Sequence, residues 1–445
     1  MKKFIKSKVA RQALVIYLGI VAAMIVVLLT FTGCTDTCQT TTTYISYEPV
    51  LESMSALRND VDILPPQPRA LQGKIYIYGD YLLLGDPGKG IHIFNNSDQT
   101  NPDAVSFLNI PGNVDMAVRD GRLYADSYVD MVVFDMRDIN NITLVNRVEN
   151  AFPNYNQQFG LWLDTDEVVT SMREVSTEEI TTDCSDSGPG MIFWGGVRED
   201  MLMVDAGSAP SAVNMAAAPS VGIGGSMARF TIVSDYLYTV DDYMMHIFSL
   251  AAPDDPVEVN EVNLGWGIET IYPFKNNLFI GSRTGMFIYN INDPANPLKM
   301  SGVQHINTCD PVVANDDYAF VTLRSENSNT WCGDNFTNQL DVIDISDITN
   351  AKLLHTYDML SPYGLGLDGN TLFVTEGNHG LKVFDVTDVA KIDENMIHHI
   401  TGFNAFDVIP YNGTLILTGN DGLYQFDYTN MDEIKMLSLI EAGGE

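Results

Sequence analysis

Short apolar segments separated by polar turns repeat along the chain from about residue 73 to residue 441. Each unit reads as an apolar strand, a polar turn, a second apolar strand, a loop, and a third strand that usually ends in Asn or Asp. Seven predicted third strands align, at residues 91–95, 131–135, 245–249, 286–290, 340–344, 381–385 and 423–427. Asx residues and prolines follow most of them, as a tight reversal requires. No helical periodicity of any length follows residue 60.

The spacing of these copies predicts the architecture. Most lie about 40 residues apart, the length of one four-stranded propeller blade. One longer interval carries an extra loop at 324–338. The other, between residues 131 and 245, has room for a further blade, with strands at 160–163 and 167–171, and for a Gly/Ala/Ser-rich insertion at 185–226.

The sequence therefore predicts an all-β β-propeller of eight four-stranded blades over residues 73–441. The alternative is seven blades, with 160–226 as one large excursion. An array of β-sandwiches also gives short strands at regular spacing. The identical strand order in every unit, without linkers between units, favours the closed ring.

The first 33 residues have the pattern of an export signal. Five cations up to Arg11 precede an apolar run from Ala13 to Phe31, and Thr32-Gly33-Cys34 follows. This end resembles a bacterial lipobox, which implies that Cys34 becomes the lipidated first residue of the mature chain. Phe31 stands where such motifs usually have Leu. An uncleaved membrane helix is the alternative, since the apolar run is nearly long enough to span a bilayer. Residues 34–72 are then a tether and lead-in to the propeller.

The four remaining cysteines suggest disulfides, because their number is even in a chain expected to be exported. Cys309 begins a predicted first strand, and Cys332 lies in the loop between the second and third strands of the same blade. Both positions fall on one face of a propeller, so we predict a disulfide between them. Cys184 could pair with Cys38 of the tether.

Charge excludes nucleic acid as a partner. The formal net charge is −34, and beyond residue 33 there are 19 Lys and Arg against 58 acids. Phosphate binding needs clustered cations, whereas this surface attracts cations or basic partners. Hydrophobic residues make up 45% of the chain, which is enough to bury a core.

The third strands and their turns resemble the LVIVD-repeat family of bacterial surface propellers, with the closest match from Met286 to Pro297 and a looser one from Leu340 to Asp347. The whole stretch from Gly73 to Leu439 resembles lipoproteins of this family from Bacteroidetes-type bacteria. This resemblance implies the fold, export and placement at the cell surface, and we expect an outer-membrane lipoprotein that faces either the periplasm or the outside. It implies nothing about catalysis.

First strands line the channel of a propeller, and ligands usually meet one mouth of that channel. When the units are aligned, one residue of each lies at the predicted start of its first strand, and we call this set the column of strand starts: Lys74, Asp115, Gly160, Arg229, Glu269, Asp310, Gly364 and Asp407. Its four acids could hold a hard cation such as calcium, although polar strand ends bonded to one another or to water are the simpler interpretation. The same face should collect further polar and aromatic residues: Trp266, Arg324, Trp331, Asn338, Gln339, Tyr363 and His379. Caps on the blade interfaces are the plainer explanation of these aromatics.

The sequence shows no catalytic signature: it has no His-Glu-x-x-His pair, Gly-x-Ser-x-Gly elbow, phosphate loop or Cys-x-x-Cys. We therefore expect a membrane-anchored, non-enzymatic module that binds or scaffolds a protein, peptide or glycan and needs no cofactor. One alternative is a polysaccharide hydrolase or lyase using Asp115, Glu269, Asp310 and Asp407 as general acids and bases. Another is a purely structural platform that uses its blade edges.

Overall fold

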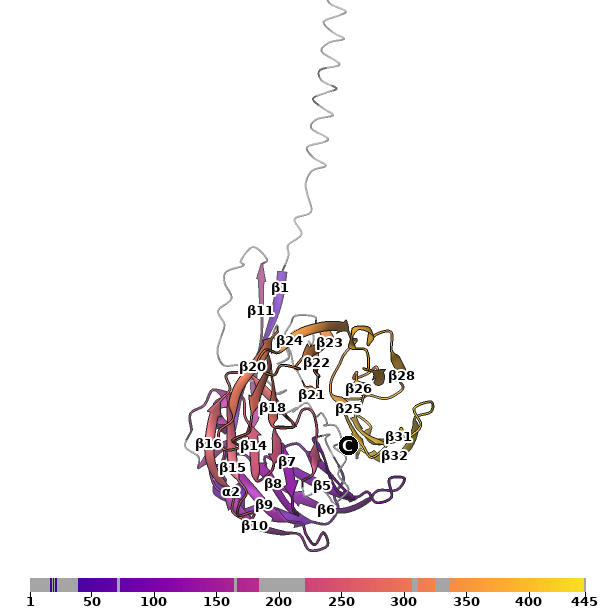
Figure 1. Cartoon of the computed structure of the whole chain (residues 1–445). Coiled ribbons are helices and arrows are strands. Elements are labelled where there is room, and N and C mark those ends of the chain that lie inside the picture. Colours follow the sequence, from indigo (N-terminus) through magenta and orange to yellow (C-terminus); the bar gives the residue numbers. More distant parts are fainter. Residues whose placement is uncertain are drawn as a thin grey trace, which may run out of the picture. The chain divides into compact units, whose positions relative to one another are not determined.

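The computed structural model describes residues 39–69, 73–163, 166–183, 221–305, 311–324 and 337–443, together with residues 17, 19 and 21. Two compact units divide the chain: Pro49–Met172 with Val197–Glu445, and Met1–Glu48 with Arg173–Gly196. The first unit contains seven antiparallel four-stranded blades (Figure 1). Among the described residues, no helix is long and apolar enough to cross a membrane.

The blades follow one another in sequence. Blade 1 is β3 (Ile75–Tyr78), β4 (Tyr81–Asp86), β5 (Gly90–Asn95) and β6 (Asp103–Asn109); blade 2 is β7 (Met116–Arg119), β8 (Arg122–Ser127), β9 (Asp130–Asp135) and β10 (Thr143–Val148). Blade 3 is β13 (Phe230–Val233), β14 (Tyr236–Val240), β15 (Met244–Ser249) and β16 (Val257–Asn263); blade 4 is β17 (Ile268–Phe274), β18 (Asn277–Ser282), β19 (Gly285–Asn290) and β20 (Leu298–Gln304).

Blade 5 is β21 (Val312–Ala314), β22 (Tyr318–Arg324), β23 (Asn338–Asp344) and β24 (Lys352–Asp358); blade 6 is β25 (Leu365–Asp368), β26 (Thr371–Thr375), β27 (Leu381–Asp385) and β28 (Met396–Ile400). Blade 7 is β29 (Asp407–Tyr411), β30 (Thr414–Gly419), β31 (Gly422–Asp427) and β32 (Lys435–Glu441). All seven predicted third strands are present, within two residues of their predicted bounds.

The prediction of an eighth blade is wrong, and the seven-bladed alternative is correct. Residues 161–163 form no strand, and Gly160 ends a 3-10 helix, η1 (Tyr155–Phe159). The next strand, β11 (Glu167–Asp183), pairs with β1 (Gln39–Ser53) in a separate two-stranded sheet. The apolar spacing at 160–171 is strand-like, but no third and fourth strands follow within the described residues to complete a blade.

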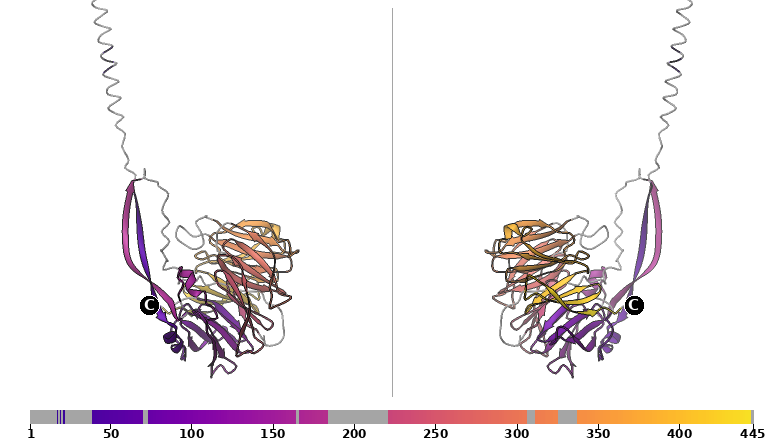
Figure 2. Two further views of the ribbon diagram at one scale, coloured as in Figure 1. Left: turned by 90° about the vertical axis from the view of Figure 1, so that its left-hand side faces the viewer. Right: turned by 90° about the vertical axis from the view of Figure 1, so that its right-hand side faces the viewer.

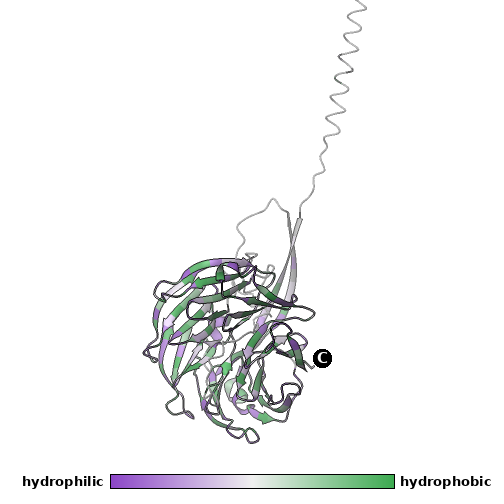
Figure 3. Ribbon diagram, turned by 45° about the vertical axis from the view of Figure 1, so that its right-hand side comes forward, coloured by the Kyte–Doolittle hydropathy of each residue, from purple (hydrophilic) through white to green (hydrophobic). Residues whose placement is uncertain are grey.

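Hydrophobic residues run along the blade strands (Figure 3). Their buried side chains form clusters that neighbouring blades share. The first strands of successive blades contact one another, which makes them the inner wall of the ring, and Figure 2 gives two further views of the blades around it. Blade 7 closes onto blade 1 through a buried cluster that joins Ile75 and Ile77 to Ile409, Ile416 and Leu423. The ring is therefore continuous.

Turn chemistry fixes the shape of each blade. In blade 7 the first hairpin turns at Asn412 and Gly413, both with positive φ, the conformation that a two-residue hairpin prefers. In every blade the fourth strand carries a bulge opposite the third. A bulge twists an edge strand and discourages edge-to-edge pairing.

A repeated hydrogen bond locks neighbouring blades together. The acceptor is the backbone carbonyl of the fourth residue after a third strand. The other group of the bond is a side chain of the preceding blade. Six of the seven junctions have it, with side chain and carbonyl in the order Tyr124 and Pro253, Tyr238 and Pro294, Ser301 and Ile348, Tyr357 and Val389, His398 and Met431, and Ser438 and Gln99. The Asx/Pro turns seen in the sequence therefore serve as docking points between blades.

Segments outside the repeats extend blade 1 to six strands. β2 (Asp62–Leu64) pairs with its outer strand, and β12 (Ile223–Gly224) pairs with its inner strand. Before β2, the short helix α2 (Met54–Asn59) is fastened to blade 2 by Arg58, whose guanidinium donates to both oxygens of the buried Asp130 at 2.7 and 2.9 Å.

Candidate functional site

Five of the eight residues predicted to lie at the starts of first strands do so in the structure. Lys74, Asp115, Arg229 and Gly364 each directly precede a first strand, and Asp407 begins one. Glu269 is one position out of line, because a bulge between Ile268 and Thr270 shifts the register of β17. Gly160 belongs to no blade, and Asp310 lies outside the described residues. We call the face where these starts lie the channel mouth.

The chain itself occupies the channel. After β12, residues 225–228 are all buried and make contact with three different blades. The Met227 carbonyl accepts a hydrogen bond from Lys74 Nζ of blade 1 at 2.6 Å, and the Ala228 carbonyl accepts one from the Ile271 amide of blade 4 at 2.8 Å. The Ser226 hydroxyl accepts from the Leu365 amide of blade 6 at 3.5 Å. We call residues 225–228 the plug.

One of the predicted ligand-binding acids, Asp115, is instead a structural partner of the segment that follows the plug. Asp115 is 2% exposed, and its carboxylate accepts hydrogen bonds from the amides of Arg229 and Phe230, directly after the plug, at 2.5 and 3.2 Å. Burial raises the pKa of Asp115, and the nearby Lys74 ammonium partly offsets that rise. Asp115 therefore anchors the plug and does not face solvent.

Asp407 is buried more completely. It is 0% exposed, and neither carboxylate oxygen has a hydrogen-bond partner of good geometry in the described part of the chain. Burial raises the pKa of Asp407 well above its usual range, with Lys74 only partly opposing the shift. Asp407 therefore does not face solvent.

The accessible chemistry of the mouth lies on blades 4 to 6. Trp266 is 46% exposed, and the Arg283 guanidinium lies 5.1 Å from its ring centre. Arg283 Nε also donates to Glu269 at 3.1 Å. Glu269 thus holds the arginine beneath an exposed indole, and this cation–π contact orients the ring.

A second stack lies between blades 5 and 6. The Arg324 guanidinium lies 3.5 Å from the centre of the Tyr363 ring, which in turn meets Phe406 edge to face. Gly377 makes room for Tyr363, because a Cβ there would lie 2.7 Å from the ring and its φ is +50°. The linker before Tyr363 is held by the fully buried Glu376, which accepts from the Leu360 amide and pairs with Lys382 at 2.8 Å.

Beside this second stack a cavity of about 350 Å³ is lined by Asn338, Gln339, Asp358 and neighbouring residues. Asn338, Gln339, Arg324 and Tyr363 were all predicted for this face. The sequence analysis did not predict Arg283. Its position directly after a second strand, on the same face as the strand starts, could have indicated it. Trp331 and all five cysteines lie outside the described residues, so the disulfide and the lipidation site stay predictions.

One group of metal-ligand type lies elsewhere. Among the described residues, His246, Glu258 and Glu261 bring one ligand atom each within 4.8 Å of the others. They sit on the third and fourth strands of blade 3, and His246 Nδ1 already pairs with Glu258 at 2.7 Å. The group is unrelated to the predicted column.

No protein-family model matches this sequence, and no curated protein matches it. The resemblance to the LVIVD-repeat family therefore stays a prediction.

Solved structures resemble the chain at low identity. The computationally designed Ika8 protein is 7% identical with a TM-score of 0.47, covering 83% of this chain and 87% of its own. Sqt1 of Saccharomyces cerevisiae is 9% identical with a TM-score of 0.45, covering 85% of this chain and 90% of its own. BamB of Moraxella catarrhalis is 8% identical with a TM-score of 0.45, covering 85% and 96%. Similarity at this level assigns no function.

Proposed function

We propose that this chain is a cell-envelope lipoprotein whose propeller binds a protein, peptide or glycan at the channel mouth of blades 4 to 6, without catalysis. The observation that supports this proposal is the pair of arginine–aromatic stacks, Arg283 with Trp266 and Arg324 with Tyr363. Rigid aromatic surfaces beside fixed guanidinium groups offer both apolar contact and directed hydrogen bonds, the combination enriched at binding surfaces.

Catalysis by the mouth acids has less support. Two-carboxylate chemistry needs both groups within reach of one substrate. Of the described candidates, Asp115 and Asp407 are buried, and Glu269 is ion-paired with Arg283. A binding role needs no such pair.

The anchor and the location rest on the sequence. The basic start, the apolar run and Cys34 support an outer-membrane lipoprotein. Metabolic labelling with a fatty acid tests this step: label on the native chain should disappear in Cys34→Ser. Label that persists in this variant would remove the anchor from the proposal.

A photo-crosslinking residue at position 266 of the full-length protein, in its native cells, tests the binding face. Irradiation should give a discrete adduct, and mass spectrometry of the adduct distinguishes a polypeptide partner from a glycan. The control is the same residue at position 298, because Leu298 is 65% exposed on the outer strand of the same blade. Equal adducts at both positions, or none at 266, would overturn the assignment of this face.

A further inference from the structure

Three side chains of blade 3 bring metal-ligating atoms together: His246 on β15, and Glu258 and Glu261 on β16. One imidazole nitrogen and one oxygen from each carboxylate all lie within 4.8 Å of one another. His246 is 1% exposed, whereas both glutamates are exposed. We call these three residues the blade 3 cluster. It has a buried nitrogen ligand and an open side through which an ion can enter.

A β-bulge puts the two glutamates on one face of the sheet. Side chains alternate along a strand, so residues three positions apart normally point to opposite faces. The register between β15 and β16 shifts at Ile247 and Phe248, which leaves Glu261 opposite His246 and Glu258 opposite Phe248. His246 and Phe248 are two positions apart and share a face, so both glutamates share that face with them.

The histidine ring is held in the orientation that a metal ligand needs. Its Nδ1 faces Glu258 at 2.7 Å, and its Nε2 faces the carboxylate of Asp241 at 3.4 Å. Metal-ligating histidines commonly donate the N–H of their second ring nitrogen to a carboxylate outside the ligand set, which fixes the ring and its tautomer. The ring of Phe152 meets the imidazole edge to face, with 6.0 Å between ring centres. Nδ1 is therefore the nitrogen available to a metal beside Glu258.

Blade 1 shows the same histidine without the acids. His92 and Asp86 hold the positions of His246 and Asp241, with His92 Nε2 3.6 Å from the Asp86 carboxylate. Phe107 lies opposite His92, where blade 3 has Glu261. A buried histidine–aspartate pair thus belongs to the blade architecture, and the two glutamates are an addition to it.

No other blade has an acid at either glutamate position. The residues equivalent to Glu258 are Ala104, Leu144, Lys299, Leu353, Met396 and Met436. Those equivalent to Glu261 are Phe107, Arg147, Gly302, Thr356, His399 and Leu439. Neither position therefore needs a carboxylate for the fold, and blade 3 has one at both.

The carboxylates around His246 are not balanced by lysine or arginine. Among the residues that the structure describes, the ion pairs of Asp241 and Glu258 are both with His246, and Glu261 has none. Three acids therefore surround one imidazole. A divalent cation would supply the missing positive charge, and the formal net charge of −34 draws cations toward this surface.

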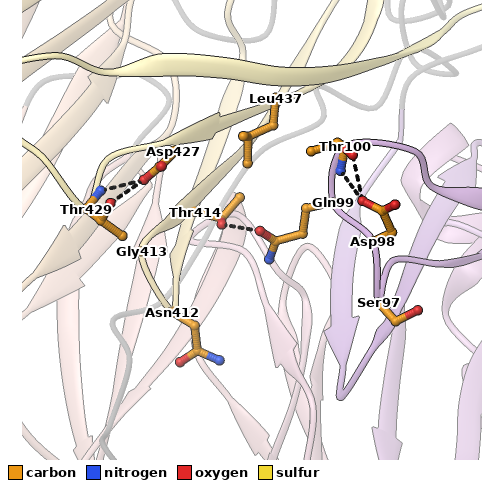
Figure 4. A pocket seen from close by; sticks show the side chains of 10 residues that line it. All are labelled: Ser97, Asp98, Gln99, Thr100, Asn412, Gly413, Thr414, Asp427, Thr429 and Leu437. Carbon is orange, nitrogen blue, oxygen red and sulfur yellow. Dashed lines mark hydrogen bonds between the residues drawn. The ribbon is translucent and has the colours of Figure 1, made fainter.

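Exposed acids alone do not make a metal site. Asp98 and Asp427 line a cavity of about 420 Å³ where blade 7 meets blade 1 (Figure 4). Each accepts the hydroxyl of a threonine in its own turn, and Thr414 donates to Gln99 in the same space. The residues that line this cavity include no histidine. The buried and oriented imidazole is what distinguishes the blade 3 cluster.

We propose that His246, Glu258 and Glu261 bind a divalent transition-metal ion, of which zinc fits best. Zinc accepts imidazole nitrogen together with carboxylate oxygen, and three protein ligands leave a fourth position for water. The ligands of a tetrahedral zinc lie about 3.3 Å apart. The 2.7 Å contact between His246 and Glu258 therefore has to open slightly while Glu261 closes in, which exposed glutamate side chains can do by rotation. The site uses no residue of the channel mouth, so its test is independent of the binding role proposed there.

Isothermal titration of the full-length protein, freed of metal with a chelator, tests the site with zinc chloride as the probe. We expect one saturable site, and weaker binding of calcium and magnesium, because both prefer ligand sets made only of oxygen. Zinc should also raise the Tm of the wild type, because the ion binds the folded cluster. Calcium that binds as tightly as zinc would contradict the assignment to a transition metal.

Glu261→Gln is the most direct variant, because this carboxylate has no ion pair in the described part of the chain. Its Tm without zinc should equal that of the wild type. Its zinc affinity should fall at least about tenfold, since loss of even an outer-shell partner costs that much. Asp98→Asn is the matched control: it removes the same charge from another exposed acid and should leave zinc affinity unchanged.

Three results would each overturn the proposal. Wild-type zinc affinity in Glu261→Gln would assign the ion to other ligands, such as the cysteines. An equal loss in Asp98→Asn would mean that zinc responds only to the overall negative charge. The third is the absence of saturable zinc binding to the wild type.

Discussion

The side-chain amides of Asn96 and Gln425 hydrogen-bond each other reciprocally, at 2.9 and 2.8 Å, across the junction where the last blade meets the first. Both are buried, at 9% and 0% exposure. Between blades 4 and 5 the equivalent positions hold Ile288 and Ile345, which share one hydrophobic cluster. The closing junction thus has a buried amide pair where the contact between blades is otherwise apolar. In other folds, buried polar groups of this kind help to specify one pairing among similar alternatives.

Replacing one member of this pair should destabilise the ring. Asn96→Leu or Gln425→Ile leaves a buried amide without its partner, at a cost of about 1–3 kcal/mol. The double variant restores the apolar contact of the other junctions and should recover most of the lost stability. Thermal unfolding of the four proteins as a double-mutant cycle measures the coupling. Additive losses would mean that the two amides act independently.

The hydrogen bond between blades predicts a contrast among three serines. Ser301 and Ser438 each donate to a carbonyl of the next blade, at 2.6 and 2.7 Å. Ser106 holds the equivalent strand position in blade 1, but its buried hydroxyl has no hydrogen-bond partner among the residues that the structure describes. Ser301→Ala and Ser438→Ala should each cost about 1 kcal/mol of unfolding free energy, and Ser106→Ala should cost nothing or stabilise. Equal effects at all three positions would contradict a role for this bond.

The attachment of α2 depends on one buried carboxylate. Asp130 is fully buried, and Arg58 and Arg147 both donate to it. Asp130→Asn leaves two cations without their full partner and should cost about 3 kcal/mol or more, with faster hydrogen exchange in α2. Glu149→Gln is the control, because Arg58 also pairs with Glu149, which is 59% exposed, and exposed pairs contribute less than about 1 kcal/mol. A similar loss in both variants would contradict this account.

The blades were predictable from sequence because their signals are local. An apolar third strand followed by an Asx/Pro turn recurs seven times, and every copy is a third strand in the structure. Five of the eight predicted channel positions followed from the same register, whereas Glu269 is displaced by a bulge and Gly160 belongs to no blade. A bulge depends on cross-strand pairing, which no local pattern shows.

The plug and the false eighth blade could not be read in this way. Residues 225–228 are small or apolar and sit in a Gly-rich stretch that reads as an insertion. Their place in the channel depends on groups distant in sequence, such as Lys74 and Leu365. Likewise, 167–171 is a genuine strand, but its partner is the lead-in strand β1. Strand propensity predicted that residues 167–171 form a strand, but it could not predict which strand they pair with.

Asp407 predicts the pH dependence of stability. An unfolded aspartate titrates near about 3.9, whereas burial raises the pKa of Asp407 in the folded protein well above that value. Between the two values the folded protein keeps a proton that the unfolded chain releases. Stability from this group is therefore greatest at the acidic end of that window and is lost as pH rises through it, by up to about 1.4 kcal/mol per pH unit.

Asp407→Asn keeps the shape of the side chain without its charge. We expect its Tm to be close to that of the wild type near about pH 4 and higher than the wild type at about pH 8, where ionisation of the unfolded wild type opposes folding. Asp427→Asn should instead lower the Tm across neutral pH, with the difference shrinking only as pH falls below about 4, because the pKa of Asp427 is lowered in the fold. Parallel Tm curves for wild type and Asp407→Asn across this range would show that Asp407 carries no raised pKa, and that the plug region accommodates its charge.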